Sequence, residues 1–252
     1  MLTPAAIAKA AALLVAARRT RSPLARLPAS CRPQTVADAL AIQAAIVGQL
    51  GERVAGWKVG TVVDGALTYG VLLASRVMRS PGGIAAADVT PLGMEAEVAF
   101  RFLRDAPPRA EPYSYAEVAD RVVAFPALEI VATRFTDYAT TPFLERLADC
   151  MSNGAFVIGV ERIRWRTFDL PRLPVELRFD DHVVVAQVGG HAAGDPLLPA
   201  VALVNELRAS TGVTAGQVMT TGTYTGLNFA QPGQRVRASF EGFGAAEAVT
   251  TA

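Results

Sequence analysis

The spacing of apolar residues divides the chain into a helical beginning and a strand-rich remainder. Residues 3–19 follow a helical pattern, in which Thr3 is expected to cap the helix and Pro4 to occupy its first position. A second helix is expected over residues 35–50, where apolar side chains recur at intervals of three and four. From about residue 54, strand-forming residues and a period of two replace the helical spacing, which indicates β-strands.

The strand-rich part contains few helices and no regular alternation of strand and helix. Its clearest strand is MEAEVAF, residues 94–100, and others are expected in PALEIVATRF, SNGAFVIG, VELRFD, HVVVAQVGG, QVMTTGTY and QRVRASFEGFG. Two helices interrupt the strands, one over about 115–123 behind a capping box of Ser114 and Glu117, the other from Asp195 to about 210. This order favours an α+β protein over a chain of βαβ units.

Composition and charge exclude several classes of protein. The chain has 252 residues and a net charge of +1, so it lacks the basic surplus of a nucleic-acid scaffold. No apolar run approaches the roughly 20 residues that cross a bilayer, and Lys9 interrupts the N-terminal run, which is therefore expected to be a helix and not a signal peptide. The two cysteines, Cys31 and Cys150, lie far apart and fit a cytoplasmic protein better than a disulfide framework or a cysteine zinc site.

Three glutamates are the candidates for a metal site, because the chain has only two histidines. Glu95 and Glu97 lie two apart on a strand and therefore share a face, which by itself is more typical of a solvated strand face. Glu129 is the single acid inside the apolar strand PALEIV, where it needs a cation or a partner such as Arg134. Three carboxylates without histidine favour a hard ion, Mg²⁺ or Mn²⁺.

A lysine and a threonine-rich segment are further candidates. Lys58 lies in GWKVG between glycines that allow close backbone approach; it either reaches the surface or is partly buried with a lowered pKa, ready to transfer a proton or hold a carboxylate. The segment TTGTYTG, residues 220–226, is either a hydroxyl-lined anion loop or, by strand propensity, an edge strand followed by a turn. His182 and His191 are expected in turns, without the nucleophile of a Ser/His/Asp hydrolase.

From about residue 35 to the C-terminus, these segments in their order resemble the 2-keto-4-pentenoate hydratase branch of the fumarylacetoacetate hydrolase superfamily. The resemblance rests on ALAIQ, GWKVG, GVLLASRV, MEAEVAF, PALEIVATRF, DCMSNGAFVIG, GDPLLPAVALVNEL, AGQVMTTGTYTG and PGQRVRASFEGFG. It implies an α+β fold: a strand-rich β-roll or distorted barrel of the fumarylacetoacetate hydrolase type, with an N-terminal helical segment. Together with the turn-rich residues 79–93, it predicts a helical segment, 1–80, leading into the lysine strand, and a catalytic domain, 81–252.

The resemblance also implies the roles of the candidate residues. Glu95, Glu97 and Glu129 match the family's ligands for Mg²⁺ or Mn²⁺, and Lys58 matches its active-site lysine. The loop Thr221-Gly222-Thr223 matches the segment that faces the substrate, with Lys58 and Thr223 as the expected catalytic residues. Homo-oligomers are implied as well. One departure concerns the stretch after the lysine, where an acidic residue is usual but Thr68 and Tyr69 stand here.

The implied activity is that of a metal-dependent hydro-lyase of aromatic catabolism. It would add water to a small 2-hydroxy-2,4-dienoate, the tautomer of a 2-oxo acid, and form a 4-hydroxy-2-oxo acid. Three alternatives stay open on the same residues: decarboxylation of a 2-oxo-3-enedioate of the 4-oxalocrotonate type, hydrolytic C–C cleavage of an acylpyruvate, and a non-catalytic partner protein. The sequence predicts neither a nucleic-acid partner nor a membrane.

Overall fold

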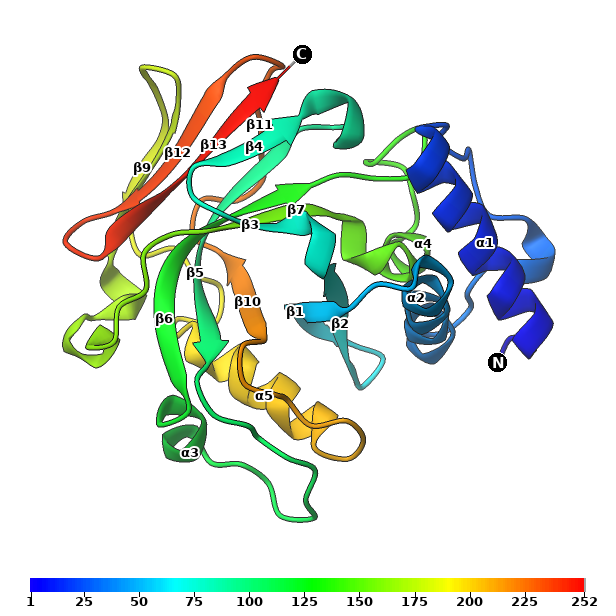
Figure 1. Cartoon of the computed structure of the whole chain (residues 1–252), viewed down its shortest axis with the longest axis horizontal. Helices are drawn as coiled ribbons and strands as arrows, with labels where there is room; N and C mark the ends of the chain where they lie inside the picture. The colour runs from blue at the N-terminus through cyan, green and yellow to red at the C-terminus, as the bar shows by residue number, and fades with distance from the viewer. Residues whose placement is uncertain (252) are drawn as a thin grey trace.

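Two helices form the N-terminal part of the computed structural model, which describes residues 1–251 (Figure 1). They are α1 (Pro4–Thr20) and α2 (Val36–Leu50), and they pack against each other. The side chains of Thr3 and Thr35 cap them by accepting the backbone N–H groups of Ala6 and Asp38. Both helices predicted from the apolar spacing are therefore confirmed.

Strands between Val54 and Thr251 form two sheets. The larger, eight-stranded sheet has the order β2-β1-β10-β5-β6-β7-β3, with β11 beside β5. Its strands are β1 (Val54–Val63), β2 (Ala66–Leu73), β3 (Val77–Arg79), β5 (Gly93–Phe102), β6 (Val122–Val131), β7 (Asn153–Ile158), β10 (Val218–Thr223) and β11 (Asn228–Phe229).

The smaller sheet has five strands in the order β4-β13-β12-β8-β9. They are β4 (Gly82–Ala85), β8 (Pro174–Phe179), β9 (His182–Val188), β12 (Arg235–Phe240) and β13 (Gly244–Thr251). Three short helices complete the chain: α3 (Tyr115–Ala119), α4 (Phe143–Ala148) and α5 (Leu197–Leu207). Within the described residues no helix has both the length and the apolar character that crossing a membrane requires.

Most neighbouring strands run antiparallel, and the larger sheet curls so that β5 and β6 bend strongly along their length (Figure 1). Every residue of β6 is buried, because the smaller sheet and the helices cover the faces of the larger one. The expected α+β fold, a strand-rich roll with an N-terminal helical segment, is confirmed. The division at residue 80 stays a prediction; β1 and β2 hydrogen-bond into the same sheet as β5 and β10.

Element boundaries differ from the sequence pattern where tertiary pairing decides them. The capping box of Ser114 and Glu117 is present, but α3 ends at Ala119 because the following residues enter β6. The strand β13 had no clear signal, since GAAEAVTT is rich in alanine, which has low strand propensity. It forms because the turn after β12 returns the chain alongside that strand.

Candidate active site

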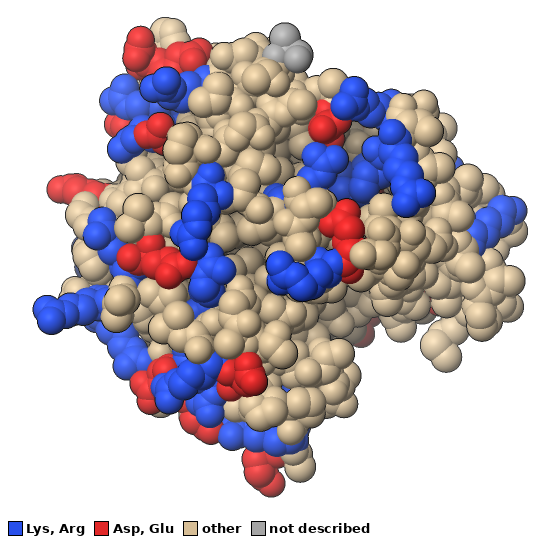
Figure 2. Space-filling view, in the orientation of Figure 1, with Lys and Arg blue, Asp and Glu red and all other residues tan. Residues whose placement is uncertain are grey.

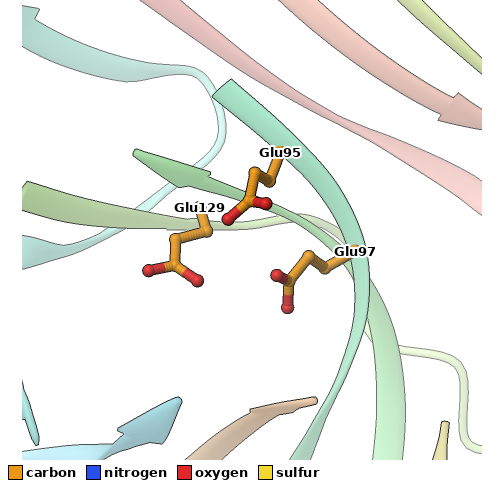
Figure 3. A group of neighbouring side chains, drawn as sticks. All are labelled: Glu95, Glu97 and Glu129. Atoms are coloured by element: carbon orange, nitrogen blue, oxygen red, sulfur yellow. The ribbon is translucent and has the colours of Figure 1, made fainter. Parts of the chain in front are cut away.

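Three glutamate side chains converge between two neighbouring strands of the larger sheet. Glu95 and Glu97 lie on the same face of β5, and the antiparallel register places Glu129 of β6 directly opposite Glu95. One carboxylate oxygen from each lies within 4.8 Å of the others, and the three groups point toward one another (Figure 3). The sequence prediction that these carboxylates meet is confirmed, while their role as metal ligands stays a prediction.

These carboxylates are not on a solvated face. Glu97 is 2% exposed and Glu129 is 0% exposed, while Glu95 is half-buried. The solvated-face interpretation of the glutamate pair is therefore wrong, because both faces of this central sheet are covered. Desolvation of an ionised carboxylate is costly unless a cation or hydrogen bonds compensate for it.

Lys58 provides part of that compensation. Its Nζ forms an ion pair with Glu129 Oε1, and the residue is 8% exposed, so it does not reach for the surface. Arg134, the other partner considered for Glu129, instead pairs with Asp149 at 2.6 Å between Nε and Oδ1. Lys58 lies on β1, which runs close beside β10 because Gly56 is paired with Val218. A Cβ on residue 56 would collide with the Val218 carbonyl oxygen.

The electrostatics of the site retain a surplus of negative charge. Burial, with repulsion from Glu129, raises the pKa of Glu95 to about 7, although the positive charge of Lys58 opposes this. Burial and the charges of Glu129 and Glu95 raise the pKa of Glu97 to about 8. Burial alone would lower the pKa of Lys58, but the surrounding carboxylates outweigh it and raise the pKa. Lys58 is therefore a stable cation; the lowered pKa considered from the sequence is not found.

One carboxylate oxygen of this group has no protein partner. Among residues 1–251, Glu129 Oε2 is buried and makes no hydrogen bond, whereas Glu129 Oε1 accepts from Lys58 and, at 3.3 Å, from Asn153 Nδ2. Three carboxylates against one ammonium, with a free buried oxygen, suit a divalent cation that prefers oxygen ligands. The residues present thus fit Mg²⁺ or Mn²⁺.

The threonine-rich segment forms one wall of the group, but through different atoms than expected. Its β10 strand pairs with β5 through an irregular register between Thr220 and Thr223, which brings the loop to Glu97. The hydroxyl of Thr220 and, at 3.3 Å, the backbone N–H of Gly222 donate to Glu97 Oε2. The hydroxyls of Thr221 and Thr223 instead lie 3.4 Å from the carbonyl oxygens of Val98 and Ala96.

The expectation that Thr221 and Thr223 act on a substrate stays a prediction. Gly222 has a special conformation in this loop: its φ of +126° disfavours any residue with a side chain, and a Cβ would lie 3.2 Å from His191 Nε2. The loop backbone at this point is therefore shaped by the glycine and by the imidazole behind it.

His191 lies in an irregular segment after β9, as expected, but it is buried there. Its Nε2 is 3.0 Å from the Thr221 carbonyl oxygen, its Nδ1 accepts the N–H of Ala193, and its ring packs against Tyr224. Burial lowers its pKa, so the imidazole is neutral and donates through Nε2. It supports the loop next to Glu97.

Sequence reasoning missed Thr220, Asn153 and His191 as members of the site. Thr220 belonged to a segment already singled out, whereas Asn153 begins an apolar strand and His191 follows two glycines, with nothing in either context to mark it. The acid expected after the lysine is not replaced nearby: Thr68 is fully buried and donates to Thr61 O at 2.7 Å, and Asp64 lies exposed in the turn between β1 and β2.

Residues 67–250 match the family model described as fumarylacetoacetate (FAA) hydrolase C-terminal. Among curated proteins, the chain is 30% identical over 204 residues to 2-keto-4-pentenoate hydratase 2 of Dechloromonas aromatica (strain RCB), which spans 77% of each chain. It is 27% identical to 2-keto-4-pentenoate hydratase of Paraburkholderia phymatum over 94% of this chain and 95% of that one. The chain therefore belongs to the fumarylacetoacetate hydrolase family, in its 2-keto-4-pentenoate hydratase branch.

Solved structures share the fold. The 4-oxalocrotonate decarboxylase from Pseudomonas putida G7, complexed with magnesium and adipate, superposes with a TM-score of 0.85 at 21% identity and covers 99% of both chains. The 2-hydroxyhepta-2,4-diene-1,7-dioate isomerase from Mycobacterium marinum has a TM-score of 0.55 at 16% identity, covering 79% of this chain and 76% of that one. The N-terminal helices are thus part of a known variant of this fold.

Proposed function

We propose that this member of the fumarylacetoacetate hydrolase family is a divalent-metal-dependent hydratase. It adds water to a small 2-hydroxy-2,4-dienoate of the 2-keto-4-pentenoate type and forms a 4-hydroxy-2-oxo acid. The observation that carries the proposal is the convergence of Glu95, Glu97 and Glu129 beside Lys58 in one buried group. Similarity to curated 2-keto-4-pentenoate hydratases, along 77% to 96% of the chain, supports this activity over others of the family.

Glu95, Glu97 and Glu129 are the residues that would hold Mg²⁺ or Mn²⁺. Glu129 Oε2 has no protein partner, and burial followed by mutual repulsion raises the pKa values of Glu95 and Glu97, so a cation would stabilise all three carboxylates in their ionised form. A bound divalent cation would act as a Lewis acid toward the carboxylate and the adjacent enol oxygen of the substrate. A solved relative is complexed with magnesium, which supports the choice of metal without deciding between Mg²⁺ and Mn²⁺.

Lys58 is proposed to bind the substrate carboxylate or to supply a proton. Hydration first converts the dienol to a conjugated ketone: the 2-hydroxyl loses its proton and C5 gains one. Water oxygen then bonds to C4 while C3 gains a proton. The raised pKa keeps Lys58 protonated, so it is better suited to hold an anion than to release a proton, and Glu129 fixes its position.

The loop Thr221-Gly222-Thr223 is proposed to face the substrate next to Glu97. Thr223 is half-buried, and its hydroxyl lies 3.4 Å from both Ala96 O and Thr225 Oγ1, so it is held where it could donate to a bound oxygen. The proposed catalytic role of Thr223 is supported by the family resemblance and by its position in the chain. Thr223 directly follows Gly222, whose backbone N–H donates to Glu97.

Decarboxylation of a 2-oxo-3-enedioate is the second candidate. It needs the same stabilisation of enolate charge, and the strong likeness in fold to a 4-oxalocrotonate decarboxylase supports it. The absence of an acid at Thr68, where hydratases and decarboxylases often carry one, favours neither reaction.

One assay separates the two candidates. The purified protein is incubated with 2-hydroxypenta-2,4-dienoate and, separately, with 2-oxo-3-hexenedioate, each with Mg²⁺, with Mn²⁺ and with EDTA. We expect loss of the dienol and appearance of 4-hydroxy-2-oxopentanoate by NMR, dependent on the metal. Release of CO₂ from the enedioate without hydration of the dienoate would assign the decarboxylase instead. Metal binding without turnover of either would contradict both.

The location and assembly of the protein are also part of its proposed function. We place the enzyme in the cytoplasm, as a homo-oligomer acting in the breakdown of aromatic compounds. Cys31 and Cys150 are buried free thiols, which agrees with a reducing compartment. The assembly state is a matter for analytical ultracentrifugation of the purified chain.

A further inference from the structure

A second, oppositely charged cavity lies where the C-terminal end of α1 meets the segments before β5 and after β6. Its volume is about 240 Å³, and Arg18, Arg21 and Arg134 line it together with Thr90 and Thr133. Figure 2 shows Lys and Arg side chains gathered over this part of the molecule, between the end of α1 and the segment next to β4. The lining of this cavity includes neither Lys58 nor any of the three site glutamates, so it is separate from the glutamate site.

At its inner end, two arginines share one aspartate. Arg134 Nε donates to both carboxylate oxygens of Asp149, at 2.6 and 2.8 Å, and the backbone N–H of Arg134 donates to the same group at 3.0 Å. Arg18 Nη2 is left 3.6 Å from Asp149 Oδ1, too far for a hydrogen bond. The aspartate is thus saturated by Arg134, and the second guanidinium has no comparable partner.

At the outer end the same imbalance recurs. Arg21 pairs with Asp88 at 2.7 Å, and Arg76 lies 3.6 Å from the other oxygen of that carboxylate. In the described part of the chain, four guanidinium groups around this junction therefore have ion pairs with only two carboxylates. Only the inner end, with Arg18 and Arg134, is buried, and a surplus of charge there is unfavourable unless a counter-ion or ligand neutralises it.

Arg18 shows the imbalance most directly. Its side chain is 10% exposed, and in the region covered by residues 1–251 its Nη2 is buried without a hydrogen-bond partner. Burial, and after it the positive charge of Arg134, lowers the pKa of Arg18 to about 10. The group remains charged at neutral pH, so it is a buried cation that the distant Asp149 carboxylate compensates only in part.

We propose that this cavity is a binding site for a small oxyanion carrying two negative charges, with Arg18 as its main ligand and Arg21 at its entrance. Guanidinium groups match phosphate and carboxylate oxygens through paired N–H donors. The volume is below the roughly 300–1,000 Å³ of sites for drug-sized ligands, which selects a small anion. A phosphate group and a short dicarboxylate share this chemistry. The proposal is independent of the hydratase activity.

The test measures anion binding to metal-free wild-type protein by calorimetry and by thermal unfolding. EDTA-treated protein is used so that anions bridging a metal at the glutamates contribute nothing. The probes are inorganic phosphate and succinate, with chloride at equal ionic strength as the reference. We expect one site per chain for phosphate or succinate and a melting temperature that rises with the logarithm of its concentration above saturation.

Variants locate the site. Arg18→Gln should weaken binding at least tenfold, while Arg19→Gln, an exposed neighbour on the same helix, should bind as wild type does. Arg21→Gln should weaken binding severalfold; its side chain is 59% exposed, so folding should tolerate this change even if Arg18→Gln is unstable. Glu97→Gln should leave anion binding unchanged.

The relative affinities for phosphate and succinate identify the kind of anion that the cavity binds. Tighter binding of phosphate than of succinate assigns a phosphate-bearing ligand, and the reverse order assigns a dicarboxylate. If neither anion acts beyond chloride on the wild type, or if the variants Arg18→Gln and Arg21→Gln both bind like Arg19→Gln, the proposal is overturned.

Discussion

Two groups of charge in this molecule, each with a buried inner part, have opposite surpluses. At the glutamate site three carboxylates face one ammonium group, whereas at the arginine cavity four guanidinium groups face two carboxylates. The first group comes from strands of one sheet, with its carboxylates on the adjacent β5 and β6, and the second comes from segments far apart in the chain. In both, a buried atom lacks a partner among residues 1–251: Glu129 Oε2 in one, Arg18 Nη2 in the other.

A buried imbalance of charge favours a ligand of the opposite sign. Burial favours the neutral form of every ionisable group, so a fold that keeps like charges together leaves them with shifted pKa values or with a ligand of opposite charge. The pKa of Glu97 is raised and that of Arg18 is lowered, each in the direction that reduces the local surplus. A cation and an anion, respectively, would oppose these shifts.

The largest effect is expected from Glu97→Gln, which removes one charge from the glutamate site at constant shape. Metal-dependent activity should fall at least about 10³-fold, because the Lewis acid contributes several kcal/mol and each 1.36 kcal/mol is tenfold. Steady-state kinetics and calorimetry with Mg²⁺ measure this. The matched control, Glu176→Gln on β8, changes a glutamate paired with Arg178 away from the site and should retain activity. If the metal affinity of Glu97→Gln were unchanged, Glu97 would not be a metal ligand.

Lys58→Ala should have the next largest effect. If Lys58 supplies a proton, kcat should fall about 10²-fold or more; if it holds the substrate carboxylate, KM should rise instead. The chain's other lysine, Lys9, is exposed on α1, so Lys9→Ala is the control. Wild-type values of both kcat and KM for Lys58→Ala would remove Lys58 from the mechanism.

Gly222→Ala tests how far the loop next to Glu97 is shaped by its backbone. The free energy of unfolding should fall by about 1–3 kcal/mol, because the positive φ is unfavourable for alanine. Activity should fall too, because a shift of the loop backbone would move the N–H of residue 222 away from Glu97. Gly48→Ala is a useful contrast: Gly48 lies in α2 with open space around its missing Cβ, so this change should stabilise by about 0.5–1 kcal/mol. Chemical denaturation measures both.

The pH dependence of stability should be the effect most specific to the glutamate site. Glu95 and Glu97 have pKa values of about 7 and about 8 in the folded chain, above the unfolded value of 4.5. The folded state therefore binds more protons in this window, and metal-free protein should lose stability as pH rises from about 4.5 to about 8. The raised pKa of Lys58 contributes equally throughout this window, since both of its pKa values lie above it.

The contribution of Glu97 is isolated by chemical denaturation of wild type and Glu97→Gln across this pH range. Titrating groups elsewhere affect both proteins equally and cancel in the difference between their free energies of unfolding. The variant should show a flatter profile, and saturating Mg²⁺ should abolish the decline in the wild type. A parallel decline in both proteins would contradict the assignment to Glu97. Phosphate should not change the difference, since the arginine cavity is a separate group.

Much of the fold and of the site could be predicted from local pattern. The helical spacing before residue 54 and the capping side chains of Thr3 and Thr35 specify α1 and α2 within the first 50 residues. The period of two in MEAEVAF places Glu95 and Glu97 on one face wherever that strand lies. These features depend on neighbours within about four positions, which a single sequence shows directly.

Burial and partnership could not be predicted in this way. Whether Glu97 faced water or protein depended on the smaller sheet, which packs against β5 through β12. The choice of Lys58 rather than Arg134 as the partner of Glu129 depended on the parallel pairing of β1 with β10. The same holds for Thr220 and Asn153, whose contacts with the glutamates come from strand register.

The sequence by itself determined which side chains share a strand face, which residues begin the N-terminal helices, and, through resemblance, which family the chain belongs to. Only the tertiary structure decided which charges are buried together and with what surplus. The physical reason is range: strand alternation and capping act between residues a few positions apart, whereas desolvation and charge pairing act between groups such as Arg18 and Asp149 that the fold alone brings together.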